Sequence, residues 1–280
     1  MANILDRYGI KEVADVTFYE LSNTGMPTHP VLYLDTLKVS TIEQTAEEAE
    51  ARGGKGNAAL IAWDYGKEIN VTLEDALFSA KSMAIMFGNG KVKSFDDKGT
   101  DYIMKTVQIL VTKDGEDPNG THWVGPDGKK YEMINPKYYD AEGKNVQKAD
   151  LKAEVGRYLC TFDLKAAGAV IEVSGNSFPG TYYVVGDTFA RSEASGNDEM
   201  FQFIIPKAKV TSENTITLEA EGDPSVFNMS LKVLRPADGI MMKLVKYELT
   251  GGTEVEAGTA ANLVHNHVLT PDNTSELAQG

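Results

Sequence analysis

Closely spaced glycines in the run GGKGN, residues 53–57, are the first feature that could do chemistry. Such glycines expose backbone N–H groups that can bind a phosphate. A phosphate loop requires a strand before it, a Lys-Ser or Lys-Thr pair and a helix directly after it. Here residues 42–52, which have helix-forming composition, precede the glycines, and an alternating apolar segment follows them. The context therefore favours a flexible turn.

Carboxylate pairs are the second candidate, because general acid–base catalysis uses two carboxyl groups with different pKa values in one cleft. Three pairs are close in the sequence: Asp64 with Glu68, Glu74 with Asp75, and Asp96 with Asp97. A chain with 41 acidic residues contains such pairs by composition alone. Solvated surface charge explains them without a catalytic role.

Metal ligands are a third possibility. His265 and His267 would share one strand face, with Asp272 close by, but they lie in a weakly patterned segment. Residues 114–119 resemble a calcium loop in composition, with acidic and Asn side chains whose spacing does not match the EF-hand pattern. We therefore predict no metal site and no cofactor.

The composition excludes further classes of function. The formal net charge of −14 argues against a nucleic acid partner bound through its phosphates. Cys160 is the only cysteine, which excludes an intrachain disulfide and a cysteine-based zinc site. No G-x-S-x-G motif is present, and no apolar run approaches the roughly 20 residues needed to span a bilayer. We predict a protein that is not an enzyme, has no catalytic residue and does not insert into membranes.

Apolar residues alternate over residues 59–73, which predicts either one very long strand or two strands joined near Gly66. We expect one face of this element to be in the core or between subunits: Ile61, Trp63, Tyr65, Ile69, Val71 and Leu73. The intervening polar positions point to the opposite face: Asp64, Glu68 and Asn70.

A helix is expected directly after this strand, as a brace for the sheet. Thr72 can be its N-cap, with Asp75 three residues later in a variant capping box. Its apolar stripe would comprise Leu77, Ala80, Ala84 and Phe87, and Gly88 would end it.

The remaining chain is predominantly β in character. Residues 112–154 are rich in Gly, Pro, Asp and Asn and are predicted to be a loop-rich insertion lobe. Residues 1–111 and 155–250 would form one β domain, with a hairpin turn at Asp238-Gly239. Residues 251–280 are predicted to be a flexible C-terminal extension. The expected fold class is mainly β (α+β), with one helix after a long hairpin or strand.

Several sequence segments resemble those of the tail tube (major tail) proteins of long-tailed bacteriophages. They are GGKGNAALIAWDYGKEINVTLEDALFS with the following AKSMAIMFG, then IPKAKV and EGDPSVFNMSLKVL. The resemblance covers about residues 30–89 and 155–249 and lies in element order and local phrases.

This resemblance implies a virion structural protein with a tail-tube-like β-sandwich or barrel and a flanking helix. Six copies would close a ring, and the rings would stack into a tube that conducts DNA during ejection. It also implies contacts with the tail sheath or other tail proteins and with the tape-measure protein, and synthesis in the cytoplasm of the bacterial host. DNA would pass without specific binding, and Asp64, Glu68 and Asn70 would face the lumen or another polar environment.

Two arguments from the residues support this interpretation. A strand of up to fifteen residues exceeds the usual ~5–6, and its backbone groups need a neighbour to pair with. An acidic lumen would repel phosphates and let DNA slide. Two alternatives remain. One is a monomeric β-sandwich that binds carbohydrate or calcium, with Trp63, Trp123 and Tyr138 as stacking platforms. The other is a related virion part, a baseplate tube or a tube-terminating ring.

Overall fold

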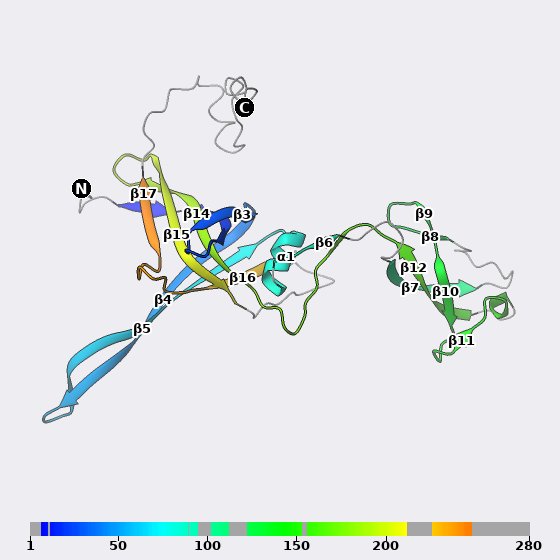
Figure 1. Ribbon diagram of the computed structural model, residues 1–280, viewed down its shortest axis with the longest axis horizontal. Coiled ribbons are helices and arrows are strands. Elements are labelled where there is room, and N and C mark those ends of the chain that lie inside the picture. The colour runs from blue at the N-terminus through cyan, green and yellow to red at the C-terminus, as the bar shows by residue number, and fades with distance from the viewer. Residues whose placement is uncertain are drawn as a thin grey trace, which may run out of the picture.

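A large antiparallel sheet forms the body of the protein (Figure 1). The computed structural model describes residues 7–10, 12–88, 90–94, 102–111, 122–152, 156–211 and 226–247. As predicted, the fold is mainly β, with one α-helix in these ranges. The nine strands of the main sheet are β1 (Tyr8–Ile10), β2 (Asp15–Leu21), β3 (Pro27–Leu34), β4 (Leu37–Gly53), β5 (Ala58–Asp75), β14 (Thr181–Ser192), β15 (Asp198–Val210), β16 (Phe227–Val233) and β17 (Lys243–Tyr247).

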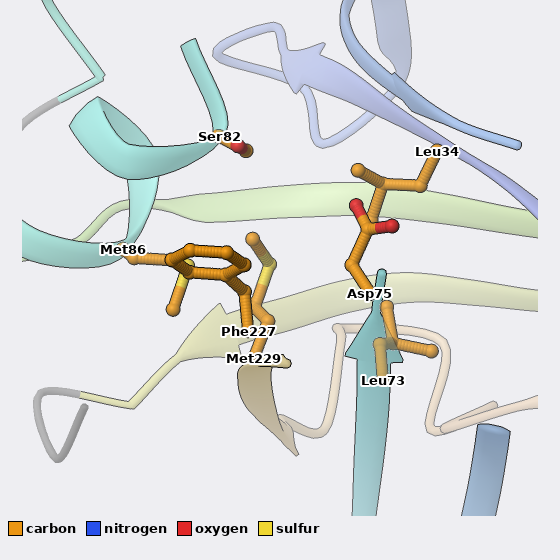
Figure 2. Close-up of a pocket in the computed structure, with 7 residues that line it drawn as sticks. All are labelled: Leu34, Leu73, Asp75, Ser82, Met86, Phe227 and Met229. Atoms are coloured by element: carbon orange, nitrogen blue, oxygen red, sulfur yellow. The ribbon is translucent and has the colours of Figure 1, made fainter. Parts of the chain in front are cut away.

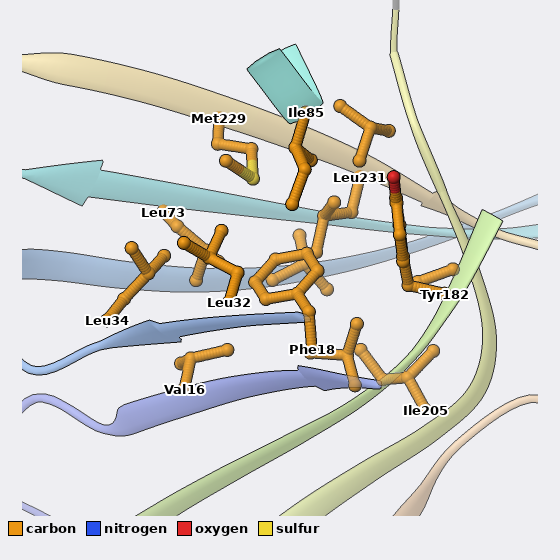
Figure 3. Packing of buried hydrophobic residues seen from close by; sticks show 14 of the residues in the cluster. Val16, Phe18, Leu32, Leu34, Leu73, Ile85, Tyr182, Ile205, Met229 and Leu231 are labelled. Carbon is orange, nitrogen blue, oxygen red and sulfur yellow. The ribbon is translucent and has the colours of Figure 1, made fainter. Parts of the chain in front are cut away.

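The main core lies on one face of this sheet. The strand order is β3-β2-β14-β15-β16-β5-β4, with β1 added to β14 and β17 added to β15. Buried side chains from β3, at one end of the order, and from β5, next to the other end, meet in one cluster, as Figure 3 shows for Leu32, Leu34 and Leu73. The sheet therefore curls around its own apolar face. No pairing joins β3 to β4 among the described strands, so the sheet is not a closed barrel.

Strands β4 and β5 form a hairpin of 17 and 18 residues, and much of it projects beyond the sheet (Figure 1). The helical propensity of residues 42–52 predicted the wrong structure. This segment is extended as part of β4, which pairs with β5 from Leu37 to Gly53. The segment lacks an apolar stripe that could stabilise a helix, so pairing decides its conformation. The glycine-rich residues 53–57 make the tight turn, in which the N–H of Asn57 donates to the carbonyl of Gly54 at 3.2 Å.

The single helix, α1 (Ala80–Phe87), begins later than predicted. Thr72 and Asp75 belong to β5, so the N-cap is Ser79, whose hydroxyl accepts from the N–H of Ser82 at 3.0 Å while the N–H of Ser79 donates to the Ser82 hydroxyl at 2.9 Å. Gly88 ends the helix, as the sequence predicted.

Asp75 explains why the helix starts late. Its carboxylate is buried and accepts hydrogen bonds from the Thr36 hydroxyl at 2.5 Å and from the N–H of Leu77 at 3.2 Å. The second bond holds Leu77 in a turn, where its side chain is 64% exposed and outside the predicted stripe. The face of α1 toward the core instead carries Ser82, Ala84, Ile85 and Met86.

A second sheet, with its own core, forms a separate lobe beyond α1 (Figure 1). Its order is β11 (Asn145–Val146), β10 (Ile134–Tyr139), β12 (Gly156–Lys165) and β7 (Tyr102–Val111). Two small pairs complete the β structure: β13 (Ala169–Val170) with β6 (Lys93–Ser94), and β8 (His122–Val124) with β9 (Lys130–Glu132); a 3-10 turn covers Asp150–Lys152.

The predicted boundaries of the insertion at 112 and 154 are therefore too narrow. Strands β7 and β12 pair with each other along their full length and bury Ile109, Tyr158 and Phe162 in the core of the lobe rather than in the main core. Their alternation is ordinary strand alternation, so the sequence could not indicate which sheet they join. The predicted extension at 251–280 lies outside the described residues.

The turn at Asp238-Gly239 is present, but it does not join a hairpin. Strands β16 and β17 both pair with β15, at Ala208–Val210 and at Met200–Ile204 respectively, so they follow one another along the same edge. Residues 234–242 leave this edge and return to it. Local turn chemistry therefore predicted the turn correctly and the pairing wrongly.

Gly186 in β14 lies directly opposite Phe203 in β15, and a Cβ at Gly186 would sit 2.1 Å from the Phe203 ring. We predict that Gly186→Ala lowers the free energy of unfolding by about 1–3 kcal/mol, because the buried ring must move. Urea denaturation measures this loss. Gly9→Ala, where nothing lies within 4 Å, is the control with a change near zero. Equal stability of the two variants would contradict the packing argument.

Asp75→Ala should lower the free energy of unfolding by about 1–3 kcal/mol, because it leaves the Thr36 hydroxyl and the Leu77 N–H without their acceptor. Thermal and urea unfolding measure the loss. The neighbouring Glu74→Ala is the matched control, with a change within about 0.5 kcal/mol, because Glu74 has no such bonds in the described part of the chain. If both substitutions have the same effect, Asp75 does not anchor this junction.

Candidate assembly surface

The outer part of the β4–β5 hairpin is a two-stranded ribbon with free edges. Strand β5 pairs with β16 only at residues 70–75, and beyond that point its sole partner among the described strands is β4. Strand β4 ends the sheet order, so its other edge is also free. Isolated two-stranded ribbons are marginally stable in water, and free edges carry unpaired N–H and C=O groups. The ribbon is thus a surface that a neighbouring chain can complete.

A β-bulge at Gly66 interrupts the long alternation of β5. Glu47 lies opposite Tyr65 and Thr45 lies opposite Glu68, so residues 66 and 67 oppose Ala46 alone. Gly66 has a φ of 63°, the left-handed conformation that suits this kind of bulge. Strand β5 is continuous over 18 residues, so the predicted single long strand is correct and the alternative of two joined strands is wrong. The bulge explains why the sequence suggested a break near Gly66.

The bulge moves the apolar residues to the other face of the sheet. Residues directly opposite one another share a face, and β4 keeps its regular alternation through Thr45 and Glu47. Tyr65 therefore shares its face with Glu68, while Ile69 shares its face with Gln44 and the core. An extra residue in one strand reverses which side chains point each way. The predicted continuous face from Ile61 to Leu73 is wrong for this reason.

Three large apolar side chains form a stripe on the outer face of the ribbon. Ile61, Trp63 and Tyr65 are 54%, 54% and 53% exposed. Opposite Ile61 and Trp63 lie Ala51 and Ala49, so the β4 half of this face is flat. We call Ile61, Trp63 and Tyr65 the apolar stripe. An exposed apolar row of this kind marks a surface that another protein can cover.

Acidic side chains occupy the opposite face of the ribbon. Asp64 lies directly opposite Glu48, and Ala62 lies opposite Glu50. Glu50 accepts a hydrogen bond from Nε of Arg52 at 2.6 Å, whereas Glu48 and Asp64 have no basic partner in the described ranges. Asp64 was expected on one face with Glu68 and Asn70, but the bulge separates it from them.

The inner part of β5 belongs to the main core. Ile69, Val71 and Leu73 are at most 4% exposed, and Leu73 packs with Leu34 and Met229 (Figure 3). Glu68 and Asn70 lie on the outer face of the sheet, where Glu68 forms an ion pair with Lys232 at 2.7 Å. Of the predicted helix residues, Ala80, Ala84 and Phe87 lie in α1, and Ala84 is fully buried.

The cavity between β5 and α1 has room for about 10 Å³ of water-sized space, enough for one water molecule at most (Figure 2). No group of three or more His, Cys, Asp and Glu side chains in the described ranges is placed to hold a metal ion. The predicted candidates His265, His267, Asp272, Asp96 with Asp97, and residues 114–119 fall outside these ranges.

The three aromatic residues considered as stacking platforms for carbohydrate lie in different parts of the structure. Tyr138 is only 2% exposed and lies in the core of the second sheet. Trp123 packs against Phe162 and lies under the Lys105 ammonium at 4.5 Å from the ring centre, whereas Trp63 lies on the hairpin. The three rings therefore do not share a face. No described helix has the length and apolar character required to cross a membrane.

Comparison with known proteins agrees with the geometry. The model of the YomU/Tube protein family matches residues 8–245, which include every described strand except the last two residues of β17. No curated protein matches the chain. A match over most of the length, together with a β fold that projects an apolar ribbon, shows that this chain belongs to the YomU/Tube family, a phage tail tube-like family.

Proposed function

We propose that the protein assembles with copies of itself into hexameric rings, which stack as the phage tail tube and conduct DNA during ejection. The single observation that carries this proposal is the ribbon of β4 and β5, which combines free backbone edges with an exposed apolar stripe. Membership of a tube-type structural family supports the same conclusion.

The ribbon supports assembly for an energetic reason. Covering the half-exposed Ile61, Trp63 and Tyr65 would contribute roughly 1 kcal/mol each, about half the effect of burying a fully exposed side chain. Backbone pairing along a free edge adds hydrogen bonds that the isolated subunit lacks. A closed ring removes the edges from every copy at once, as a barrel does.

The charge supports the conduit. A net charge of −14 gives a surface that repels phosphates, so DNA would pass the tube without specific binding. We further propose contacts of the stacked rings with a tail sheath or other tail proteins outside and with a tape-measure protein inside. On this proposal the protein is located in the virion tail after synthesis in the host cytoplasm, and it acts as a structural subunit without catalysis.

Purified protein should form a species of roughly six times the subunit mass of 30.5 kDa, with rings or tubes in negative-stain electron micrographs. Trp63→Ser/Tyr65→Ser should reduce the assembled fraction at least tenfold and leave the subunit folded, because the pair is exposed in the subunit. Light scattering measures the mass, and circular dichroism checks the fold.

Phe178→Ser/Leu159→Ser is the matched control, because these side chains are 66% and 47% exposed elsewhere. This control should assemble like the wild type. A wild-type protein that stays monomeric at every concentration would overturn the proposed function. Substitution of the fully buried Val71 is not informative here, because Val71→Asp would unfold the subunit itself.

A further inference from the structure

Two cross-strand pairs on exposed β surfaces each bring together residues of like charge. One pair is acidic and the other is basic. On the ribbon, Glu48 of β4 faces Asp64 of β5. On the body of the sheet, Lys209 of β15 faces Lys232 of β16. Like charges at directly opposed positions destabilise a sheet, so each pair is unfavourable in the isolated subunit.

The lysine pair lies on the outer face of the sheet. Its neighbours along the strands, Ala208, Val210 and Leu231, are buried in the main core, so alternation directs the lysines outward. Beside them, three basic residues, Lys67, Lys232 and Arg235, and one acidic residue, Glu68, line a groove of about 410 Å³ at the base of the hairpin. We call Lys67, Lys209, Lys232 and Arg235 the basic site.

The basic site is largely unneutralised. Among the described residues its one ion pair joins Lys232 to Glu68 at 2.7 Å, and both side chains are nearly half exposed, so this pair contributes little to stability. Lys209 and Arg235 have no acidic partner in the part of the chain that the structure describes. In a protein of net charge −14, such a site is placed to bind an acidic surface.

We propose that the acidic pair of one copy, Glu48 and Asp64, docks on the basic site of the next copy, a contact that rests on the proposed ring assembly. Cross-strand pairs of this kind have Cβ atoms about 4.5–5.5 Å apart, so two carboxylates can meet two ammonium groups without a change in either strand. Repulsion within each pair is then replaced by attraction between copies.

The register of the ribbon is consistent with this docking. Asp64 and Glu48 lie on the face that continues the core side of the sheet, whereas Lys209 and Lys232 lie on the outer side. A ribbon that extends past the edge of its own subunit can therefore cover the outer surface of the next one. The contact joins two different patches, as a ring requires.

Charge exchange tests the contact. Glu48→Lys/Asp64→Lys and Lys209→Glu/Lys232→Glu should each reduce the assembled fraction at least tenfold, because like charges then meet. The variant with all four substitutions should recover at least half of wild-type assembly, since the attraction is restored with reversed signs. An equimolar mixture of the two double variants should also assemble, because each supplies the charge that the other lacks.

Two controls match the change in net charge. Glu132→Lys/Glu142→Lys and Lys130→Glu/Lys137→Glu replace exposed residues of the second lobe and should assemble like the wild type. Circular dichroism checks that every variant is folded. In addition, Glu48→Gln should raise the melting temperature of the subunit by relieving its repulsion with Asp64, while it weakens assembly several-fold.

The outcomes distinguish the docking contact from the ring assembly on which it rests. If the wild type assembles and the double variants do so equally well, the docking proposal is wrong while the proposed function stands. If the fourfold variant is folded but fails to assemble, the proposal is also wrong. If Lys209→Glu/Lys232→Glu assembles normally but loses binding to a DNA duplex, the basic site binds phosphate instead. If the wild-type protein never assembles, the proposed ring assembly is wrong.

Discussion

The pairing of β5 with β16 over residues 70–75 is the interaction on which the rest of the structure depends. It places the buried Val71 and Leu73 against the core strands and fixes the position at which the hairpin leaves the sheet. Every residue of β5 before that point has only β4 as a partner among the described strands. The same strand is therefore a core element at one end and a free ribbon at the other.

The bulge at Gly66 lies near the boundary between these two parts. A regular strand would have continued the apolar face of Ile69 and Val71 into the ribbon, with Tyr65 on the core side. The extra residue reverses this arrangement, so the apolar stripe faces outward and the acidic pair continues the core side. One glycine thus decides which chemistry each face of the ribbon presents to a neighbour. This separation allows apolar burial and charge pairing to act on different faces of the ribbon.

The junction after β5 shows how a tertiary contact overrides a local signal. Thr72 and Asp75 satisfy the spacing of a capping box, yet Thr72 pairs with Ser230 in the ladder and Asp75 binds Thr36. A ladder position provides backbone hydrogen bonds and side-chain burial together, which a cap alone does not match. Ser79 then caps the helix that covers the core (Figure 2). The buried carboxylate of Asp75 thus joins the residues before β4 to the residues after β5.

The sequence alone determined the mainly β class, the β character of residues 59–73, the helix ending at Gly88 and the resemblance to tail tube proteins, because these depend on local periodicity and on short sequence segments. Only the tertiary structure decided that residues 42–52 form a strand, that β7 and β12 join the second lobe, and that Trp63 and Tyr65 face away from the core. Strand partners and bulges are set by contacts between distant residues, and alternation reads the same whichever strand lies alongside. For this reason the sequence could predict which positions of this strand carry apolar and acidic side chains, but not the face on which each of them lies.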